Sequence, residues 1–307
     1  MSKNKFIKNT LIFCLLTSIT LFSITKFIDY RLSLCNYDYT GKINKVIKNK
    51  LEEEITIWGA STAYVNIIPE IIEDSTGKTA FNMGLDGTNI DQYGGLLENY
   101  ITNQSNKTII IALDIHGGLM KRKSPYRLYN WLHVINNDLI YQQLKTIDSS
   151  LFWKIKYLPF YKLIYYGKHN IRNIIKPVKE LHYLEKGFKP NFGKFKSNTH
   201  EAKISFANNK NVFNYLDKIC KSGIKHNHKM IVVLTPCHKK GLESGDNKDL
   251  IIHQLQQLQN KNVTLLNFVD DPMNNFDEYF KDNTHLNQKG ANLFSNKLGK
   301  ELKNLLK

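Results

Sequence analysis

Thr108-Ile109-Ile110-Ile111-Ala112-Leu113-Asp114 is the stretch that most strongly indicates the fold, because its centre is an unbroken run of apolar side chains. A strand with one solvated face alternates apolar and polar residues, whereas a continuous apolar strand is buried on both faces. Such a strand is typical of the middle of a parallel sheet that helices cover on both sides. Residues 107–114 are therefore predicted to form a central strand of an α/β domain.

Similar apolar runs recur before and after this strand, and helical patterns separate them. The predicted strands are 54–58, 78–83, 107–114, 229–235 and 263–268, and the predicted helices are 65–75, 89–102, 250–260 and 288–306. Strands that alternate with helices along the chain indicate a doubly wound parallel sheet. The sequence thus predicts one α/β domain over residues 54–307, built on a five-stranded parallel sheet.

The segment from about 117 to 210 interrupts this alternation. It is rich in Tyr, Trp and Phe, and its apolar residues have helical rather than strand spacing. The sequence predicts a helical insertion here. Two roles stay open for it: simple packing on the sheet, or a lid or glycan platform, since aromatic side chains suit interfaces that are partly wet.

The N-terminus predicts a membrane anchor. Three lysines within the first eight residues precede an uncharged, mostly apolar stretch from Asn9 to Thr25. This pattern predicts a single spanning helix within residues 1–30 and a polar linker over 31–53, with the N-terminus cytoplasmic and the body extracytoplasmic. A cleaved signal peptide is disfavoured because no small-x-small cleavage site follows. A buried helix of a soluble protein is the remaining alternative.

Composition limits the partners that we expect. The chain has 43 Lys and Arg against 27 Asp and Glu, a formal charge of +16, which favours anionic partners. The basic residues are scattered and form no nucleic-acid-binding motif, so we expect no nucleic acid partner. The four cysteines and the histidines lack metal-ligand spacing, so we expect no metal and no cofactor. Cys220 and Cys237 are either two buried thiols or a disulfide.

Two segments at opposite ends of the domain predict the chemistry. Gly59-Ala60-Ser61 follows the first predicted strand, and Asp282-Asn283-Thr284-His285 precedes the last predicted helix. Serine is a weak nucleophile unless a base removes its proton and a third group orients that base. Ser61, His285 and Asp282 supply these three parts. The alternatives are a helix N-cap for Ser61 and a structural imidazole for His285.

This arrangement resembles the SGNH (GDSL-type) esterases and acyltransferases over roughly residues 54–118 and 229–306. The shared features are Gly-x-Ser after the first strand, Gly84 after the second, and a late Asp-x-x-His. The resemblance implies an SGNH/flavodoxin-like sheet, with Ser61 as nucleophile and first oxyanion N–H donor. It also implies Gly84 as second oxyanion donor, His285 as general base and Asp282 as its orienting carboxylate.

The third oxyanion donor departs from the family pattern. Members usually supply an Asn side chain after the third strand, whereas this chain has Asp114-Ile115-His116 there. The residue before the serine, usually Asp, is Ala60. Asn89 and His116 are the candidate substitutes for the missing donor.

The resemblance and the predicted anchor together imply a membrane-anchored serine esterase or O-acyltransferase. Its expected substrate is an acylated cell-envelope polysaccharide or a small ester on the extracytoplasmic side. The alternative is a catalytically weak or inactive protein of the same fold that serves as a polysaccharide-binding or assembly module. Hydrolysis and acyl transfer both remain open, as do the acyl group, the acceptor and the oligomeric state.

Overall fold

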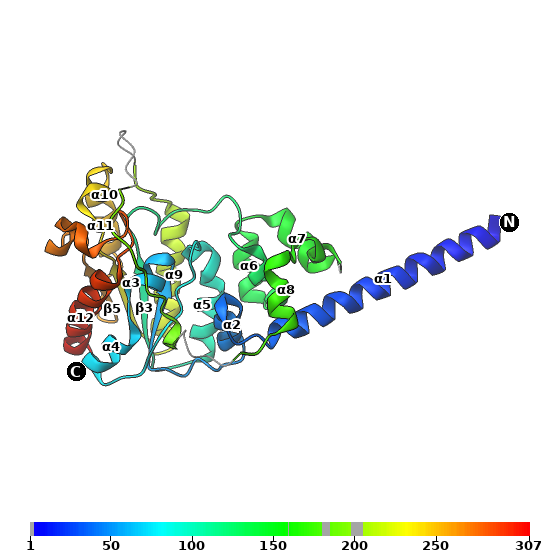
Figure 1. Ribbon diagram of the computed structural model, residues 1–307, viewed down its shortest axis with the longest axis horizontal. Coiled ribbons are helices and arrows are strands. Elements are labelled where there is room, and N and C mark those ends of the chain that lie inside the picture. The colour runs from blue at the N-terminus through cyan, green and yellow to red at the C-terminus, as the bar shows by residue number, and fades with distance from the viewer. Residues whose placement is uncertain (1–2, 159, 180–184, 198–204) are drawn as a thin grey trace.

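A parallel β-sheet lies at the centre of the protein, in a computed structural model that describes residues 3–158, 160–179, 185–197 and 205–307 (Figure 1). The strands within these ranges are β1 (Ile55–Gly59), β2 (Ala80–Asn82), β3 (Thr108–Leu113), β4 (Lys229–Leu234) and β5 (Val263–Asn267). All neighbouring strands are parallel, in the order β2-β1-β3-β4-β5. The prediction of a five-stranded parallel α/β sheet is confirmed.

The sheet is buried on both faces, as its apolar strands predict. Side chains of β3 alternate between two cores: Ile109 and Ile111 pack on one side, and Ile110 and Ala112 on the other. The first core includes side chains of α5 (Ile90–Asn103), α9 (Lys210–Lys225) and α11 (Lys248–Gln256). The second core includes side chains of α3 (Ser61–Asn66), α4 (Pro69–Thr76) and α12 (Gln288–Leu305). The domain is therefore doubly wound.

The prediction of one helix over 65–75 is wrong, because two short helices occupy this region. The chain enters α3 directly at Ser61, leaves it at Asn66, and is extended at Ile67 and Ile68. Pro69 then begins α4. A proline favours the first helical position and pushes the residue before it out of the helical region, which explains the break.

Residues predicted as a linker over 31–53 are packed into the domain. α1 (Lys3–Ser33) is followed by α2 (Asp38–Ile47), which contacts α5. Ile43, Val46 and Leu51 from this region lie in the first core and are almost completely buried. The segment is therefore part of the domain and not a free connection.

Short helical segments, joined by non-helical stretches, occur in the described part of the predicted insertion between β3 and α9. They are η1 (Leu128–Asn130), η2 (Leu132–Val134), α6 (Asp138–Lys145), α7 (Ser149–Tyr157), η3 (Tyr161–Tyr165), α8 (Lys168–Ile175) and η4 (Glu185–Gly187). α6 packs against α5, so the insertion extends the helical layer on that face. After β4 and β5 come α10 (Lys239–Glu243), η5 (Pro272–Asn275) and η6 (Asp277–Tyr279).

α1 projects from the body as a single long helix (Figure 1). The helix has 31 residues and is long and apolar enough to cross a membrane, and most of its side chains are exposed.

The four cysteines are free thiols, so the disulfide alternative for Cys220 and Cys237 is wrong.

Candidate active site

Ser61 is placed by a turn that only glycine can make. Gly59, the last residue of β1, has φ +155°, and a Cβ there would lie 2.5 Å from the Ala112 carbonyl oxygen. The chain turns through Ala60, and Ser61 is the first residue of α3. Ala60 is the N-cap and makes no side-chain capping bond, so the alternative reading of Ser61 as an N-cap is wrong.

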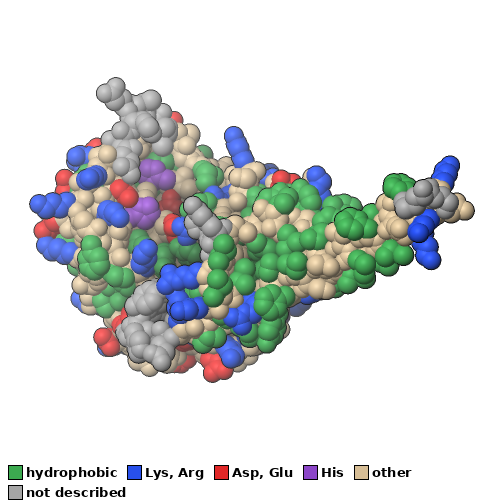
Figure 2. Space-filling model, turned by 45° about the vertical axis from the view of Figure 1, so that its right-hand side comes forward, with side chains coloured by type: hydrophobic (Ala, Val, Ile, Leu, Met, Phe, Trp, Pro, Cys, Tyr) green, Lys and Arg blue, Asp and Glu red, His purple; other side chains and the backbone are tan. Residues whose placement is uncertain are grey.

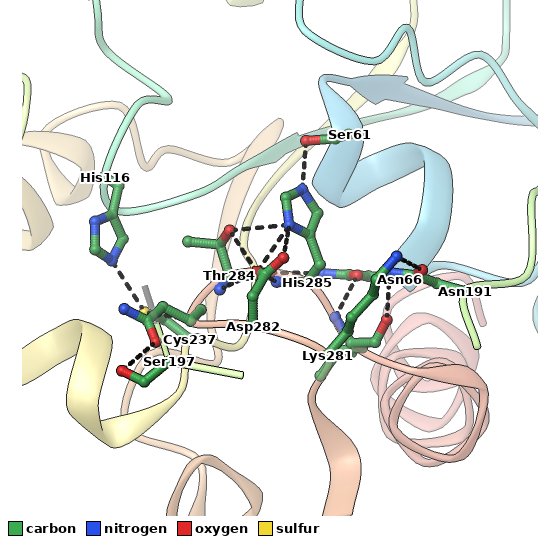
Figure 3. A network of polar contacts seen from close by, with 12 residues as sticks. Ser61, Asn66, His116, Asn191, Ser197, Cys237, Lys281, Asp282, Thr284 and His285 are labelled. Atoms are coloured by element: carbon green, nitrogen blue, oxygen red, sulfur yellow. Dashed lines mark hydrogen bonds and ion pairs between the residues drawn. The ribbon is translucent and has the colours of Figure 1, made fainter. Parts of the chain in front are cut away.

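The Ser61 hydroxyl lies against the imidazole of His285. Ser61 Oγ is 2.7 Å from His285 Nε2, although the two residues are 224 positions apart in the sequence (Figure 3). The opposite ring nitrogen, Nδ1, is 2.9 Å from each carboxylate oxygen of Asp282. The three predicted residues therefore form one continuous hydrogen-bonded chain.

The turn that carries His285 is organised by the carboxylate that orients it. Asp282 Oδ1 accepts the backbone N–H groups of Thr284 at 3.0 Å and of His285 at 2.9 Å. These bonds fix the side chain of Asp282 and the backbone of His285 in one local unit. Contacts within this one turn are thus sufficient to position Asp282 against His285.

Asn66 joins this turn to the helix that begins at Ser61. Its Nδ2 donates to the Thr284 carbonyl at 3.3 Å, and its Oδ1 accepts the Leu286 N–H at 3.0 Å, so it holds the backbone on both sides of His285. Asn66 is fully buried. The sequence analysis missed this residue, and the only available signal was an Asn five positions after the serine.

Interactions with neighbouring carboxylates raise the basicity of the His285 imidazole. Burial alone would lower the pKa of His285, but its hydrogen bond and charge interaction with Asp282 outweigh burial, and the net pKa shift is upward. Asp114 and Asp86 raise the pKa of His285 further. Burial opposes ionisation of Asp282, yet the His285 bond and charge and the two backbone N–H groups lower its pKa to about 2. Asp282 is therefore ionised at neutral pH.

The site lies at the carboxyl edge of the sheet where the strand order reverses. Ser61 follows β1 and Asp114 follows β3, and these two strands are neighbours. Connections from adjacent strands leave in opposite directions at such a point and form a crevice that commonly binds ligands. Asp114 Oδ1 accepts the Gly117 N–H at 2.6 Å, which folds the chain back after β3.

Gly84 does not offer the free amide that the resemblance implies. Its N–H donates to Asn82 Oδ1 at 2.8 Å, and its carbonyl accepts from the buried Lys42 ammonium at 2.8 Å. A Cβ at Gly84 would lie 2.5 Å from the Tyr64 backbone nitrogen, so the glycine serves close packing against α3. The assignment of Gly84 as second oxyanion donor is corrected accordingly.

Asn82 is a second residue that the sequence analysis missed. It is completely buried, and its Nδ2 donates to the carbonyls of Ala63 and Ile67 at 2.7 and 2.8 Å, while its Oδ1 accepts from Gly84. These bonds tie the end of β2 to α3. An Asn at the end of a strand two residues before a glycine was its only sequence signal.

Replacing Asn82 by leucine is expected to lower the free energy of unfolding by about 3 kcal/mol, because three buried backbone groups lose their partner. Chemical denaturation of the full chain in detergent measures this. Asn275→Ala is the matched control, since Asn275 is exposed and bonds only to the Pro272 carbonyl. Equal stability of the Asn82→Leu variant and the parent would contradict the assigned role.

The other two candidate donors are directed elsewhere. Asn89 is the N-cap residue of α5, and its Nδ2 donates to the Met120 carbonyl at 3.1 Å. His116 Nε2 lies 3.4 Å from Cys237 Sγ, and Figure 3 shows the ring pointing toward that thiol rather than toward Ser61. Neither side chain contacts Ser61. The structure therefore corrects both assignments.

The thiol of Cys237 is not an activated nucleophile. Burial raises its pKa, and the charges of Asp114 and Asp282 raise it further. Burial lowers the pKa of His116, so that ring is neutral at pH 7 despite the nearby carboxylates. A thiolate–imidazolium pair is disfavoured by both shifts.

Cationic side chains surround the space beside the triad. A cavity of about 480 Å³ is lined by Gly193, Lys194, Lys196, Lys281 and Asp282. In the view of Figure 2, histidine side chains are exposed on the body with Lys and Arg side chains around them. Over the described residues, no group of three or more His, Cys, Asp or Glu side chains is placed to hold a metal ion.

No protein-family model matches the chain, and no curated protein matches it in sequence. The geometry and charges of the chain itself are therefore the basis on which a function can be proposed.

Proposed function

We propose that the protein is a membrane-anchored serine esterase or O-acyltransferase of SGNH type, acting on acyl esters of an extracytoplasmic glycan. The observation that carries this proposal is the hydrogen-bonded chain from Ser61 Oγ through His285 to Asp282. Serine, a basic imidazole and an ionised carboxylate in this order are the parts that acyl transfer through a serine requires.

In the proposed reaction Ser61 Oγ attacks the ester carbonyl while His285 Nε2 takes the hydroxyl proton. The oxyanion that forms is stabilised by N–H groups at the start of α3, and Asp282 stabilises the imidazolium. Collapse breaks the bond to the leaving alcohol, which receives the proton from His285. Water then releases a carboxylic acid, or a sugar hydroxyl accepts the acyl group, and Ser61 regains its proton.

The proposed location and substrate class are based on α1 and on the positions of the lysine side chains. Lysines at the start of the chain ahead of an apolar span favour a cytoplasmic N-terminus, and with it a catalytic body outside the cytoplasm. The lysine-lined cavity beside Asp282 suits an anionic polymer more than a neutral one.

A non-catalytic polysaccharide-binding or assembly module is the second candidate. The observation that favours it is the engagement of Gly84, Asn89 and His116 with other partners, which leaves few donors for an oxyanion. Loss of one donor costs on the order of 10²–10³ in rate, so such a site would be slow. Measured turnover decides between the two candidates.

The expected result for the first candidate is hydrolysis of a short-chain aryl acetate by the full chain in detergent. A fluorophosphonate should abolish this activity, because the Ser61 oxygen attacks its phosphorus and displaces fluoride, which leaves a stable phosphonyl ester on the serine. Iodoacetamide should leave the activity intact, because burial keeps the Cys237 thiol protonated. Cys237→Ala is the control for thiol chemistry and should retain activity. Absence of hydrolysis, together with unreacted Ser61, would support the binding module instead.

A further inference from the structure

Helix α8 turns its apolar side chains outward. Ile171 and Ile175 are 54% and 64% exposed, whereas Asn170 and Asn173 are only 1% and 6% exposed. The asparagines bond inward, with Asn170 Nδ2 donating to the Tyr129 carbonyl at 3.2 Å and Asn173 Nδ2 to Thr40 Oγ1 at 3.4 Å. A helix at a water-exposed surface normally has the opposite arrangement.

The neighbouring segments of the insertion expose aromatic and aliphatic side chains as well. Trp153 and Tyr157 of α7 are about half exposed, Phe160 follows, and Ile164 of η3 is more exposed still. Trp and Tyr are the residues that concentrate at the boundary between membrane and water, because each has an apolar ring and a polar atom. We call the six residues Trp153, Tyr157, Phe160, Ile164, Ile171 and Ile175 the insertion face.

Hydrogen bonds hold the segments that carry the insertion face against the C-terminal end of α1. Asp29 of α1 pairs with the Lys162 ammonium and accepts a hydrogen bond from the Tyr166 hydroxyl. Arg31 donates from Nε to the Ile174 carbonyl at 2.8 Å and from Nη2 to the Ile175 carbonyl at 2.9 Å. These bonds fix η3 and α8 to the last turns of the helix. Figure 1 shows α7 and α8 on the side of the body from which α1 projects.

Charge around the insertion face favours an anionic surface. Arg172 and Lys176 are exposed at the end of α8, and Lys26 of α1 lies over the Phe22 ring at 5.4 Å. Figure 2 shows hydrophobic side chains continuing from α1 onto the body, with Lys and Arg side chains nearby. Basic and aromatic side chains that flank an apolar surface are typical of contact with phospholipid headgroups.

We propose that the insertion face lies in the headgroup region of the membrane that α1 spans, so that the body is seated on the lipid surface. The molecule that covers the insertion face is phospholipid, because this face is continuous with α1 and is surrounded by cationic side chains. This inference depends on the spanning role proposed for α1 and is independent of catalysis. A seated body keeps Ser61 in a fixed orientation above the membrane.

Trp153 provides a native probe for this contact. The chain has three tryptophans, and Trp58 and Trp131 are buried at 0% and 1% exposure. The full chain is reconstituted into vesicles of phosphatidylcholine and phosphatidylglycerol whose acyl chains carry bromine, a short-range quencher of tryptophan emission. The emission due to Trp153, taken as the difference between the parent and Trp153→Phe, is expected to fall at least about twofold relative to vesicles without bromine.

The matched control moves the probe to the opposite end of the body. Phe276 is exposed between η5 and η6, and η6 packs on α12, remote from α1 (Figure 1). The double variant Trp153→Phe/Phe276→Trp should show no bromine quenching. In the variant Ile171→Asp/Ile175→Asp, quenching of Trp153 should weaken, because two charges would enter the lipid contact.

Each alternative outcome overturns a specific part of the inference. Failure of the chain to float with vesicles would overturn the anchor and with it the seating of the body. Flotation without Trp153 quenching, or equal quenching at Phe276→Trp, would overturn the seating alone and leave catalysis untouched. If Trp153 is shielded from aqueous iodide but unquenched by bromine, a protein partner or a second copy covers the face, which also overturns the lipid assignment.

Discussion

Replacing Ser61 by alanine is expected to lower kcat for ester hydrolysis by about 10⁵–10⁶-fold, the loss typical of removing a triad nucleophile. The reason is the geometry at His285, whose Nε2 lies 2.7 Å from Ser61 Oγ, close enough to take the hydroxyl proton. Residual turnover should come from binding and from the N–H groups at the start of α3.

The members of a triad act as a unit, so their losses should not add. His285→Ala alone, and the double variant Ser61→Ala/His285→Ala, are expected to be as slow as Ser61→Ala within about tenfold. Steady-state kinetics with an aryl acetate measure all three. Ser105→Ala, at an exposed serine between α5 and β3, is the matched control and should keep full activity. Retention of more than about one-hundredth of the parental kcat in Ser61→Ala would contradict the assignment.

Asp282→Asn is expected to lower kcat by about 10⁴-fold while the fold is retained. Asparagine keeps an oxygen that can accept the Thr284 and His285 backbone N–H groups, but it removes the charge that orients and stabilises the imidazolium. Asp277→Asn is the matched control, because Asp277 makes a separate Asp–His pair, with His238 at 3.0 Å. That variant should retain activity.

The pH dependence of the same variant has a defined sign. Protonated His285 cannot accept the serine proton, and its pKa is raised above 6.5, so kcat/KM of the parent should fall with acid from a midpoint above 6.5. Removing the Asp282 charge should move this midpoint to lower pH. A parental midpoint below 6.5, or a midpoint that Asp282→Asn leaves in place, would contradict the roles assigned to His285 and Asp282.

The same carboxylate should also make the stability of the fold depend on pH. Because the pKa of Asp282 is lowered from 3.8 to about 2, its ionised form stabilises the folded state fully above pH 3.8, and this stabilisation is lost as pH falls toward 2.

Local patterns were sufficient to predict the sheet and the triad. The apolar runs that form β3 and β4 are buried on both faces, because each strand supplies side chains to two cores. An unbroken apolar run is enough to predict this burial from the sequence. Asp282 and His285 lie within one turn, so their spacing predicts their contact. The position of Ser61 follows from the glycine turn at the end of β1.

Other contacts between residues distant in the sequence could not be predicted. Asn66 bonds to residues more than two hundred positions away, and His116 meets Cys237 across the ends of two strands. The Gly84 assignment failed for a local reason, because whether its amide is free depends on the rotamer of Asn82 two residues earlier. The outward face of α8 also required the structure, since periodicity gives the apolar side of a helix but not the direction in which that side points.

If Ser61 is the nucleophile, it carries the acyl group during turnover, and this acyl-enzyme can be trapped. The full chain is mixed with an aryl acetate, quenched in acid within the first turnover, digested and analysed by peptide mass spectrometry. We expect an acetyl group on Ser61 that is absent from Ser61→Ala and from His285→Ala. Ester turnover with Ser61 unmodified, or with the acetyl group on Cys237 or another residue, would contradict it.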